Sequence, residues 1–327
     1  MGPAEVKPIF ILSLPRSGST LLQRLLSAHS KISSVAEPWL LLPLAGLTEA
    51  GGLRHFSEYS SRLSATAIRE MIRDLPGGQS EFNSAIRRFC EDIYAGLAEE
   101  GSSYFIDKTP RYHLIADFIF DVFPDAKVIF LFRHPLDILS SIVTTFSKGR
   151  FAMHHAHVDL FEGPHRLHEA ARQFADRAIV VTYEELVTRP ESTLRSLTGY
   201  LDLAFEDQMV DGYQDVSFSG SMGDRTGDTK YRAVQAGSLG RWKSVLTTYT
   251  RVRFARRYVG GLGPDVLRTF GVSAEELEEE LRSLRGSVRG SLTDAFWLAS
   301  SSLARRLAGN VVRHQWSRPS DATHKLD

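Results

Sequence analysis

The chain has 327 residues, of which 43% are hydrophobic and 24% charged, a composition typical of globular proteins. Lysine plus arginine and aspartate plus glutamate both number 39, so the bulk charge does not attract nucleic acid. Cys90 is the only cysteine, which excludes an intrachain disulfide and favours a reducing compartment. We therefore expect a cytoplasmic protein whose local basic clusters bind small anions.

No segment of the sequence is predicted to span a membrane. Residues 1–10 lack the apolar core of a signal peptide, and no run approaches the roughly 20 apolar residues of a spanning helix. Residues 292–312 predict an amphipathic helix, for which we favour packing on the body of the protein over contact with a membrane surface. We expect residues 317–327 to be disordered. The sequence gives no indication of oligomeric state.

Strands and helices are predicted in alternation along the chain. We expect strands at residues 9–14, 104–107, 128–132 and 178–182. We expect helices at residues 19–27, 63–74, 82–100, 112–123, 136–146 and 167–175, and irregular structure at 147–165 and 211–238. Such alternation predicts an α/β fold with a central parallel sheet flanked by helices. We expect one domain, residues 1–316, with a helical part from about residue 250.

The loop between the first strand and the first helix predicts an anion-binding site. Its residues supply one cation, three hydroxyls and a glycine, in the order Arg16, Ser17, Gly18, Ser19 and Thr20. A helix N-terminus behind such a loop directs backbone N–H groups and the positive end of the helix dipole at one point. No Gly-Lys pair occurs here, so the loop is not a Walker A motif. The alternative is an ordinary turn capped by Ser17 or Ser19.

A second cluster follows the strand at 128–132. Arg133 comes directly after that strand, at the end where open α/β sheets place their ligands. Pro135 suits the first turn of the next helix, and Ser141 lies eight residues after Arg133. We expect Arg133 and Ser141 to face the same anion.

These motifs resemble the PAPS-dependent sulfotransferase family, which implies a P-loop-NTPase-like three-layer fold. The resemblance assigns the 5′-phosphosulfate to Pro15, Arg16, Ser17, Gly18, Ser19, Thr20 and Leu21. It assigns the 3′-phosphate to Arg133 and Ser141. It also implies nucleotide contacts at Tyr183 and in the G-x-x-G-x-W-K segment, at Gly240, Arg241, Trp242 and Lys243. Tyr183 has a plainer alternative as the first residue of a helix.

Two departures from the family pattern point to a divergent branch. Arg16 stands where cytosolic sulfotransferases carry lysine, as it does in tyrosylprotein sulfotransferases and some bacterial relatives. Gln235 and Ala236 replace the Arg-Lys pair that precedes the late glycine, which places more of the 3′-phosphate contact on Arg133 and Ser141. We expect a carbohydrate or another natural-product hydroxyl as acceptor.

Sulfuryl transfer needs positioned cations and a base, and it needs no metal. The cations we expect are Arg16 and Lys108, which resembles the Lys-x-Pro element of carbohydrate and tyrosylprotein relatives; the alternative for Lys108 is a surface lysine in a turn. The base we expect is Glu37, which follows Arg16 by 21 residues, as in tyrosylprotein sulfotransferases. Glu37 could instead cap a helix at 39–47, and His113 is the competing base.

The other histidines carry less weight. His134, between Arg133 and Pro135, is best explained as structural. Five further histidines surround residue 160, namely His154, His155, His157, His165 and His168. They lack the regular spacing of zinc ligands, so we expect them to line the acceptor site and expect no metal.

We therefore expect a sulfotransferase that moves the sulfuryl group from PAPS to a saccharide or glycoconjugate hydroxyl and releases PAP. A polyketide or lipid hydroxyl is the alternative acceptor. A P-loop-type small-molecule kinase is disfavoured because no Gly-Lys-Ser/Thr sequence occurs in the loop. A non-catalytic nucleotide-binding protein is disfavoured because Arg16, Lys108 and Glu37 all occupy their expected positions.

Overall fold

The structure is a computed structural model, and it describes residues 6–48, 58–153, 156–219 and 236–308. Five parallel strands form one sheet in the order β2-β3-β1-β4-β5. Their bounds are Lys7–Ser13 (β1), Ile32–Ser34 (β2), Tyr104–Asp107 (β3), Lys127–Phe132 (β4) and Ala178–Thr182 (β5). The α/β fold with a parallel central sheet is therefore confirmed.

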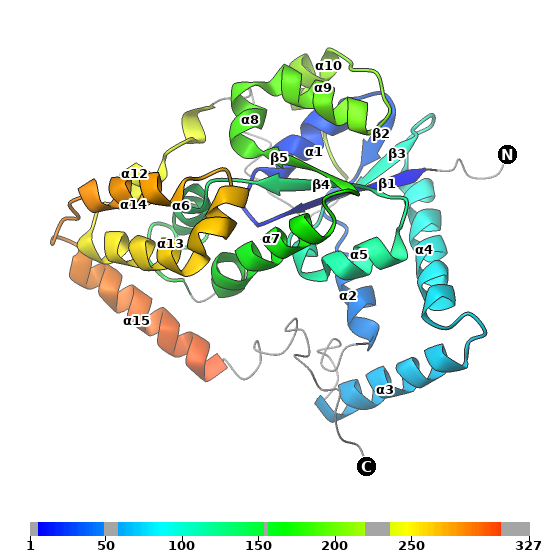
Figure 1. Ribbon diagram of the computed structural model, residues 1–327, viewed down its shortest axis with the longest axis horizontal. Coiled ribbons are helices and arrows are strands. Elements are labelled where there is room, and N and C mark those ends of the chain that lie inside the picture. The colour runs from blue at the N-terminus through cyan, green and yellow to red at the C-terminus, as the bar shows by residue number, and fades with distance from the viewer. Residues whose placement is uncertain (1–5, 49–57, 154–155, 220–235, 309–327) are drawn as a thin grey trace.

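Helices cover both faces of this sheet, giving three layers (Figure 1). One face carries α1 (Ser19–Ser27), α8 (Tyr183–Thr188), α9 (Pro190–Tyr200) and α10 (Gln208–Asp211). The other carries α4 (Gly78–Leu97), α5 (Ala116–Val122), α6 (Pro135–Thr145), α7 (Gly163–Gln173) and α13 (Tyr249–Thr269). The remaining helices are α2 (Leu41–Ala45), α3 (Glu58–Asp74), α12 (Trp242–Val245), α14 (Ala274–Ser283) and α15 (Ser291–Ala308).

The central strands supply both hydrophobic cores because their side chains alternate between the two faces. In β1, Phe10 and Leu12 belong to one core, whereas Ile9 and Ile11 belong to the other. The same alternation occurs in β4. Strands that are buried on both faces read as continuous apolar runs, which is why the sequence pattern located them.

The structure differs from the sequence predictions at three segments of the chain before residue 166. Strand β2 was not predicted, because three residues with two serines carry no periodic signal. The expected helix 112–123 divides into a 3₁₀ turn, Tyr112–Ile115, and α5. The prediction of irregular structure over 147–165 is wrong in its second half, because a π-helix, Val158–Glu162, runs into α7. Pro164 lies in the first turn of α7, where proline is tolerated in a helix.

The C-terminal part is helical, and α13 packs against α7, α14 and α15. The apolar Leu292 and Phe296 on α15 are exposed. Within the described ranges, no helix is long and apolar enough to cross a membrane. The expected helix at 292–312 is present as far as Ala308, and the tail 317–327 lies outside the described residues.

Candidate active site

The candidate site is a cavity of about 530 Å³ at the carboxyl ends of the strands. The chain places β2 and β3 on one side of β1, and β4 and β5 on the other, so the strand order changes direction at β1. Open α/β sheets bind ligands at such a switch point. The lining consists of Pro15, Arg16, Gly18, Ser19, Thr20, Glu37, Trp39, Pro110, Arg111, Arg133, Ile142, Thr145, Phe146, Ala156, Asp159 and Tyr183.

The loop after β1 leaves the N-terminus of α1 open to an anion. Its N-cap residue is Gly18, with φ +91°, and no side chain caps the helix. The alternative of a turn capped by Ser17 or Ser19 is therefore wrong. The Ser17 hydroxyl is buried, and no described residue gives it a hydrogen-bond partner. The first N–H groups of a helix have no partner within the helix, so this end can accept an oxyanion.

Arg16 extends from this loop toward α6. Its Nε donates to the Ser141 hydroxyl at 3.1 Å, and its Nη2 lies 3.5 Å from the Thr145 hydroxyl. The guanidinium also lies over the Phe146 ring, 5.6 Å from the centroid. Arg16, expected at the 5′-phosphosulfate, and Ser141, expected with Arg133 at the 3′-phosphate, are thus in direct contact.

Arg133 connects the loop to two other elements. It donates to the Arg16 carbonyl oxygen at 2.9 Å and to the Ser238 carbonyl oxygen at 3.3 Å. Its guanidinium lies 4.2 Å from the centroid of the Tyr183 ring. No described residue accepts a hydrogen bond from its Nε, although that atom is buried. Arg133 therefore retains donor capacity for a ligand.

Tyr183 packs closely on the loop. A Cβ added at Gly18 would lie 2.3 Å from a carbon of the Tyr183 ring, so glycine is required there for packing as well as for its positive φ. Tyr183 is the first residue of α8, as its plainer alternative expected, and it also lines the cavity, so its contact with a nucleotide stays a prediction.

Glu37 lines the same cavity and forms an ion pair with Lys108, which lies behind it and is not itself part of the lining. Lys108 Nζ lies 2.8 Å from Glu37 Oε1 and 3.5 Å from the Thr20 hydroxyl. The two side chains are only 3% and 10% exposed, for lysine and glutamate respectively. Trp39 Nε1 donates to the second Glu37 oxygen at 3.3 Å. The structure therefore brings the expected base and the second expected cation beside the anion loop.

The alternatives for these two residues are wrong. Lys108 is buried, so it is not a surface lysine. Helix α2 begins at Leu41 with Leu40 as its N-cap residue, so Glu37 caps nothing there. The two side chains are held in position by their contact with each other and by Thr20 and Trp39.

A buried carboxylate that sequence reasoning missed supports the Glu37 segment. Asp107 accepts hydrogen bonds from Tyr112 at 2.9 Å, Tyr94 at 2.7 Å and Thr109 at 3.4 Å. The Thr109 and Tyr112 hydroxyls in turn accept from the backbone N–H groups of Trp39 and Leu41. Burial raises the Asp107 pKa to about 6. Its position directly before Lys108 at a strand end was the signal available in the sequence.

His113 is less suited to act as the base. Its Nδ1 lies 2.9 Å from the Ser13 carbonyl oxygen, and its Nε2 is buried and has no partner among the described residues. A Cβ added at Gly163 would lie 2.9 Å from Nε2, so that nitrogen faces the start of α7. Burial lowers the His113 pKa to about 4, and the residue is not part of the cavity lining.

The G-x-x-G-x-W-K segment, residues 237–243, contacts Arg133 through the Ser238 carbonyl oxygen. The Asp137 carboxylate accepts from the backbone N–H groups of Gly240 at 2.9 Å and Trp242 at 3.1 Å. Trp242 is buried, Arg241 is exposed, and Lys243 pairs with Glu280 at 3.2 Å. None of the four motif residues lines the cavity, so their contact with a nucleotide stays a prediction. Gln235 lies outside the described residues.

None of the described histidines lines the cavity, so the expectation that they line the acceptor site is wrong for them. The His134 ring caps α6 by accepting from the Leu136 N–H at 3.2 Å, which is a structural role. His168 Nδ1 lies 2.7 Å from the Thr269 hydroxyl. His157, His165 and His168 are absent from the cavity lining, and His154 and His155 lie outside the described residues. Ala156 and Asp159 line the cavity from this segment instead. Among the described residues, no three potential ligand side chains are grouped to hold a metal ion.

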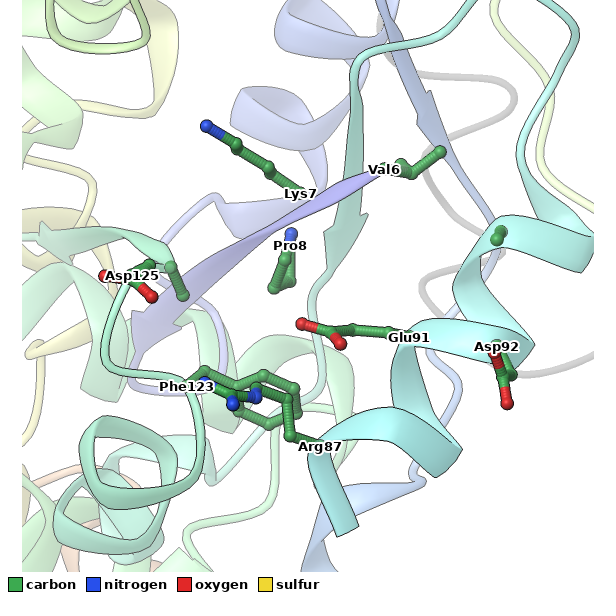
Figure 2. A pocket seen from close by; sticks show the side chains of 10 residues that line it. Val6, Lys7, Pro8, Arg87, Glu91, Asp92, Phe123 and Asp125 are labelled. Atoms are coloured by element: carbon green, nitrogen blue, oxygen red, sulfur yellow. The ribbon is translucent and has the colours of Figure 1, made fainter. Parts of the chain in front are cut away.

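A second hollow of about 550 Å³ lies at the opposite end of the sheet, between the start of β1 and α4. Figure 2 shows Glu91 of α4 directed toward Pro8, and Arg87 and Phe123 also line this hollow. This end carries the amino termini of the strands, where open α/β sheets do not place their ligands. The first cavity is therefore the candidate active site.

The fold and the loop after β1 define a P-loop-like α/β protein with an open helix N-terminus at its site. The sequence profile of the Sulfotransferase family matches residues 8–207, a range that includes Arg16, Glu37, Lys108 and Arg133. The chain belongs to the sulfotransferase family, a family of transferases.

Two curated relatives resemble the chain over part of their own length. Nodulation protein NoeE of Sinorhizobium fredii (strain NBRC 101917 / NGR234) is 35% identical over 147 residues, which are 43% of this chain and 33% of NoeE. The Protein-tyrosine sulfotransferase of Drosophila melanogaster is 28% identical over 211 residues, which are 63% of this chain and 40% of that protein. The chain thus spans about a third to two fifths of the length of these relatives.

Solved structures support the fold. The sulfotransferase domain from the curacin biosynthetic pathway is 23% identical, with a TM-score of 0.51, and the match covers 84% of this chain and 98% of that domain. The sulfotransferase domain from the Synechococcus PCC 7002 olefin synthase is 22% identical, with the same TM-score of 0.51 and coverage of 85% and 98%. At this identity the likeness establishes a shared architecture.

Proposed function

We propose that the protein transfers the sulfuryl group of PAPS to a hydroxyl acceptor. The observation that carries the proposal is the Glu37–Lys108 ion pair, which lies 3.5 Å from Thr20 in the anion loop. A carboxylate, an ammonium and an open helix N-terminus at one cavity are the groups that sulfuryl transfer needs. Membership of the sulfotransferase family supports the same chemistry.

The residues around the loop fit the charges of the donor. The N-terminus of α1 faces the 5′-phosphosulfate in this proposal, and the Ser17 hydroxyl supplies a further hydrogen bond. Arg133 and Ser141 hold the 3′-phosphate, for which the Nε of Arg133 is a suitable donor. Arginine suits this task because its planar fork binds phosphate oxygens in pairs.

The proposed reaction is an in-line transfer. The acceptor oxygen forms a bond to sulfur while the bond from sulfur to the bridging phosphate oxygen breaks, and Glu37 takes the acceptor proton. Lys108 and Arg16 stabilise the negative charge that develops on the bridging oxygen. The products are a sulfate ester and PAP.

A saccharide or glycoconjugate hydroxyl is the proposed acceptor. The cavity combines Trp39 with the charged Arg111 and Asp159, which can form hydrogen bonds with several hydroxyls of one ligand. A polyketide or lipid hydroxyl is the competing acceptor, and it would require an alcohol with a hydrocarbon chain to react better than a saccharide.

The first experiment is calorimetric titration with PAP, 5′-AMP and ATP in the absence of magnesium. We expect tight binding of PAP and much weaker binding of 5′-AMP, because Arg133 and Ser141 contact only the 3′-phosphate. Formation of a sulfate ester from labelled PAPS would then establish the activity. Equal affinity for PAP and 5′-AMP would exclude this donor site and favour a kinase-like or non-catalytic protein.

A further inference from the structure

Arg111 and Asp159 form a second charged pair in the candidate site. Arg111 Nε donates to Asp159 Oδ1 at 2.9 Å and Nη2 donates to Oδ2 at 3.1 Å, so the contact is bidentate. Both residues line the cavity, and the proposed transfer chemistry uses neither. The pair presents donors and acceptors side by side in one plane.

The backbone around this pair has an unusual conformation. Five non-glycine residues of the described chain have positive φ, and three of them line the cavity: Arg16 at 70°, Trp39 at 56° and Arg111 at 74°. Such angles are unfavourable for residues with a Cβ and concentrate at functional sites. Trp39 and Arg111 thus both hold an unfavourable backbone conformation at the cavity.

Asp159 also has an unusual backbone, because it lies in the π-helix Val158–Glu162. Short π-helical segments occur often at functional sites. The next residue after this helix, Gly163, packs so closely that a Cβ would lie 2.7 Å from Leu14 and 2.9 Å from His113. This close approach places the π-helix, and with it Asp159, against the carboxyl end of β1.

Trp39 supplies an apolar surface in the same cavity. It lies two residues after Glu37, and its indole nitrogen donates to that carboxylate at 3.3 Å. The ring is partly exposed and forms part of the lining. A flat aromatic surface is thus fixed beside the proposed base.

We propose that Trp39, Arg111 and Asp159 form the acceptor subsite and that it binds a pyranose ring. The proposal rests on the proposed function of the same cavity. Trp39 packs against the apolar face of the sugar, while Arg111 donates to one ring hydroxyl and Asp159 accepts from its neighbour. This arrangement presents one hydroxyl to Glu37.

A hydrocarbon acceptor does not match these groups. It would cover the Arg111–Asp159 pair and remove water from both charges without returning a hydrogen bond. The hydroxyls of a sugar replace the lost water at each charge. The pair therefore selects for neighbouring hydroxyls and against an alkyl chain.

The test compares acceptors and variants at saturating PAPS, with PAP release as the assay. The acceptors are a panel of methyl pyranosides and 1-octanol, and the variants are Arg111→Gln, Asp159→Asn and Trp39→Leu. The matched control is Arg195→Gln. It breaks an exposed ion pair with Glu191, and neither residue lines the cavity. We expect Arg111→Gln and Asp159→Asn each to raise the acceptor KM at least about tenfold, the usual effect of losing a hydrogen bond to a charged group. Trp39→Leu should also raise the acceptor KM, because it removes the aromatic surface on which the sugar packs. The PAP affinity of all the variants, and the acceptor KM of the Arg195→Gln control, should change less than about twofold.

The outcomes separate the subsite from the overall function. If the wild-type protein fails to bind PAP, the proposed function fails and the subsite with it. If it binds PAP but prefers 1-octanol, or if the Asp159→Asn protein keeps the wild-type KM for its best pyranoside, the subsite is wrong while the function stands. Asp159→Asn changes no positive-φ residue, so it gives a clear result even where Arg111→Gln or Trp39→Leu disturbs the backbone.

Discussion

The Lys108 ammonium lies 2.8 Å from the Glu37 carboxylate, although the two residues are 71 positions apart in the chain. Lys108 follows β3 and Glu37 follows β2, and these neighbouring strands end at the same edge of the sheet. The parallel sheet therefore brings the two charges together. The contact of Lys108 with the Thr20 hydroxyl, in the first turn of α1, is the basis of the proposed mechanism.

Replacing Glu37 with glutamine should abolish most turnover and leave donor binding intact. The amide keeps the shape of the side chain but cannot take the acceptor proton, so we expect kcat to fall roughly 10²-fold or more. PAP affinity, measured by calorimetry, should stay within about twofold. His113→Asn should reduce turnover far less, because His113 does not line the cavity. The reverse ranking would identify His113 as the base.

Breaking the Glu37–Lys108 pair from one side should destabilise the protein more than removing both charges. Each single variant, Glu37→Gln or Lys108→Met, leaves one almost buried group without its partner, which costs about 3 kcal/mol in comparable pairs. The double variant removes that unpaired charge. Urea unfolding of all four proteins at pH 7 gives the coupling free energy. Strictly additive effects would show that the pair contributes nothing to stability.

The donor site should depend on Arg133 and Gly18 in different ways. Arg133→Ala removes the proposed 3′-phosphate contact, so PAP affinity should fall at least about tenfold while 5′-AMP affinity changes little. Gly18→Ala places a Cβ 2.3 Å from the Tyr183 ring and at a φ of +91°, so it should weaken both nucleotides. Calorimetry on both variants checks this. Equal losses of PAP and 5′-AMP in Arg133→Ala would refute the 3′-phosphate assignment.

The residues proposed to bind the donor were easier to predict from the sequence than those proposed to bind the acceptor. Arg133 directly follows β4, and Arg16 lies three residues after the end of β1. Because the carboxyl ends of parallel strands meet at one edge of the sheet, their proximity could be predicted. Asp159 could not be predicted in this way. It reaches the cavity through a π-helix and the close packing of Gly163, and neither has a periodic signal in the sequence. The 3₁₀ turn after Arg111 was equally hidden within an apparently continuous helix.

Asp107 and His113 should make opposite contributions to the pH dependence of stability. Burial raises the Asp107 pKa from 3.8 to about 6, so between these values the folded state holds a proton that the unfolded chain has lost. Stability from this group falls as the pH rises through that window. Burial lowers the His113 pKa from 6.5 to about 4, so there the unfolded chain holds the extra proton and stability rises with pH.

The two slopes largely cancel in the wild-type protein between pH 4 and 6, and single variants should separate them. Asp107→Asn leaves the His113 contribution, so the free energy of unfolding should rise with pH by up to about 1.4 kcal/mol per unit. His113→Asn keeps a donor for the Ser13 carbonyl oxygen and leaves the Asp107 contribution, so the slope should have the opposite sign. Urea unfolding at pH 4, 5 and 6 measures both slopes. Slopes of the same sign in the two variants would show that the buried charges do not set this dependence, whereas opposite signs would place both groups neutral near pH 5.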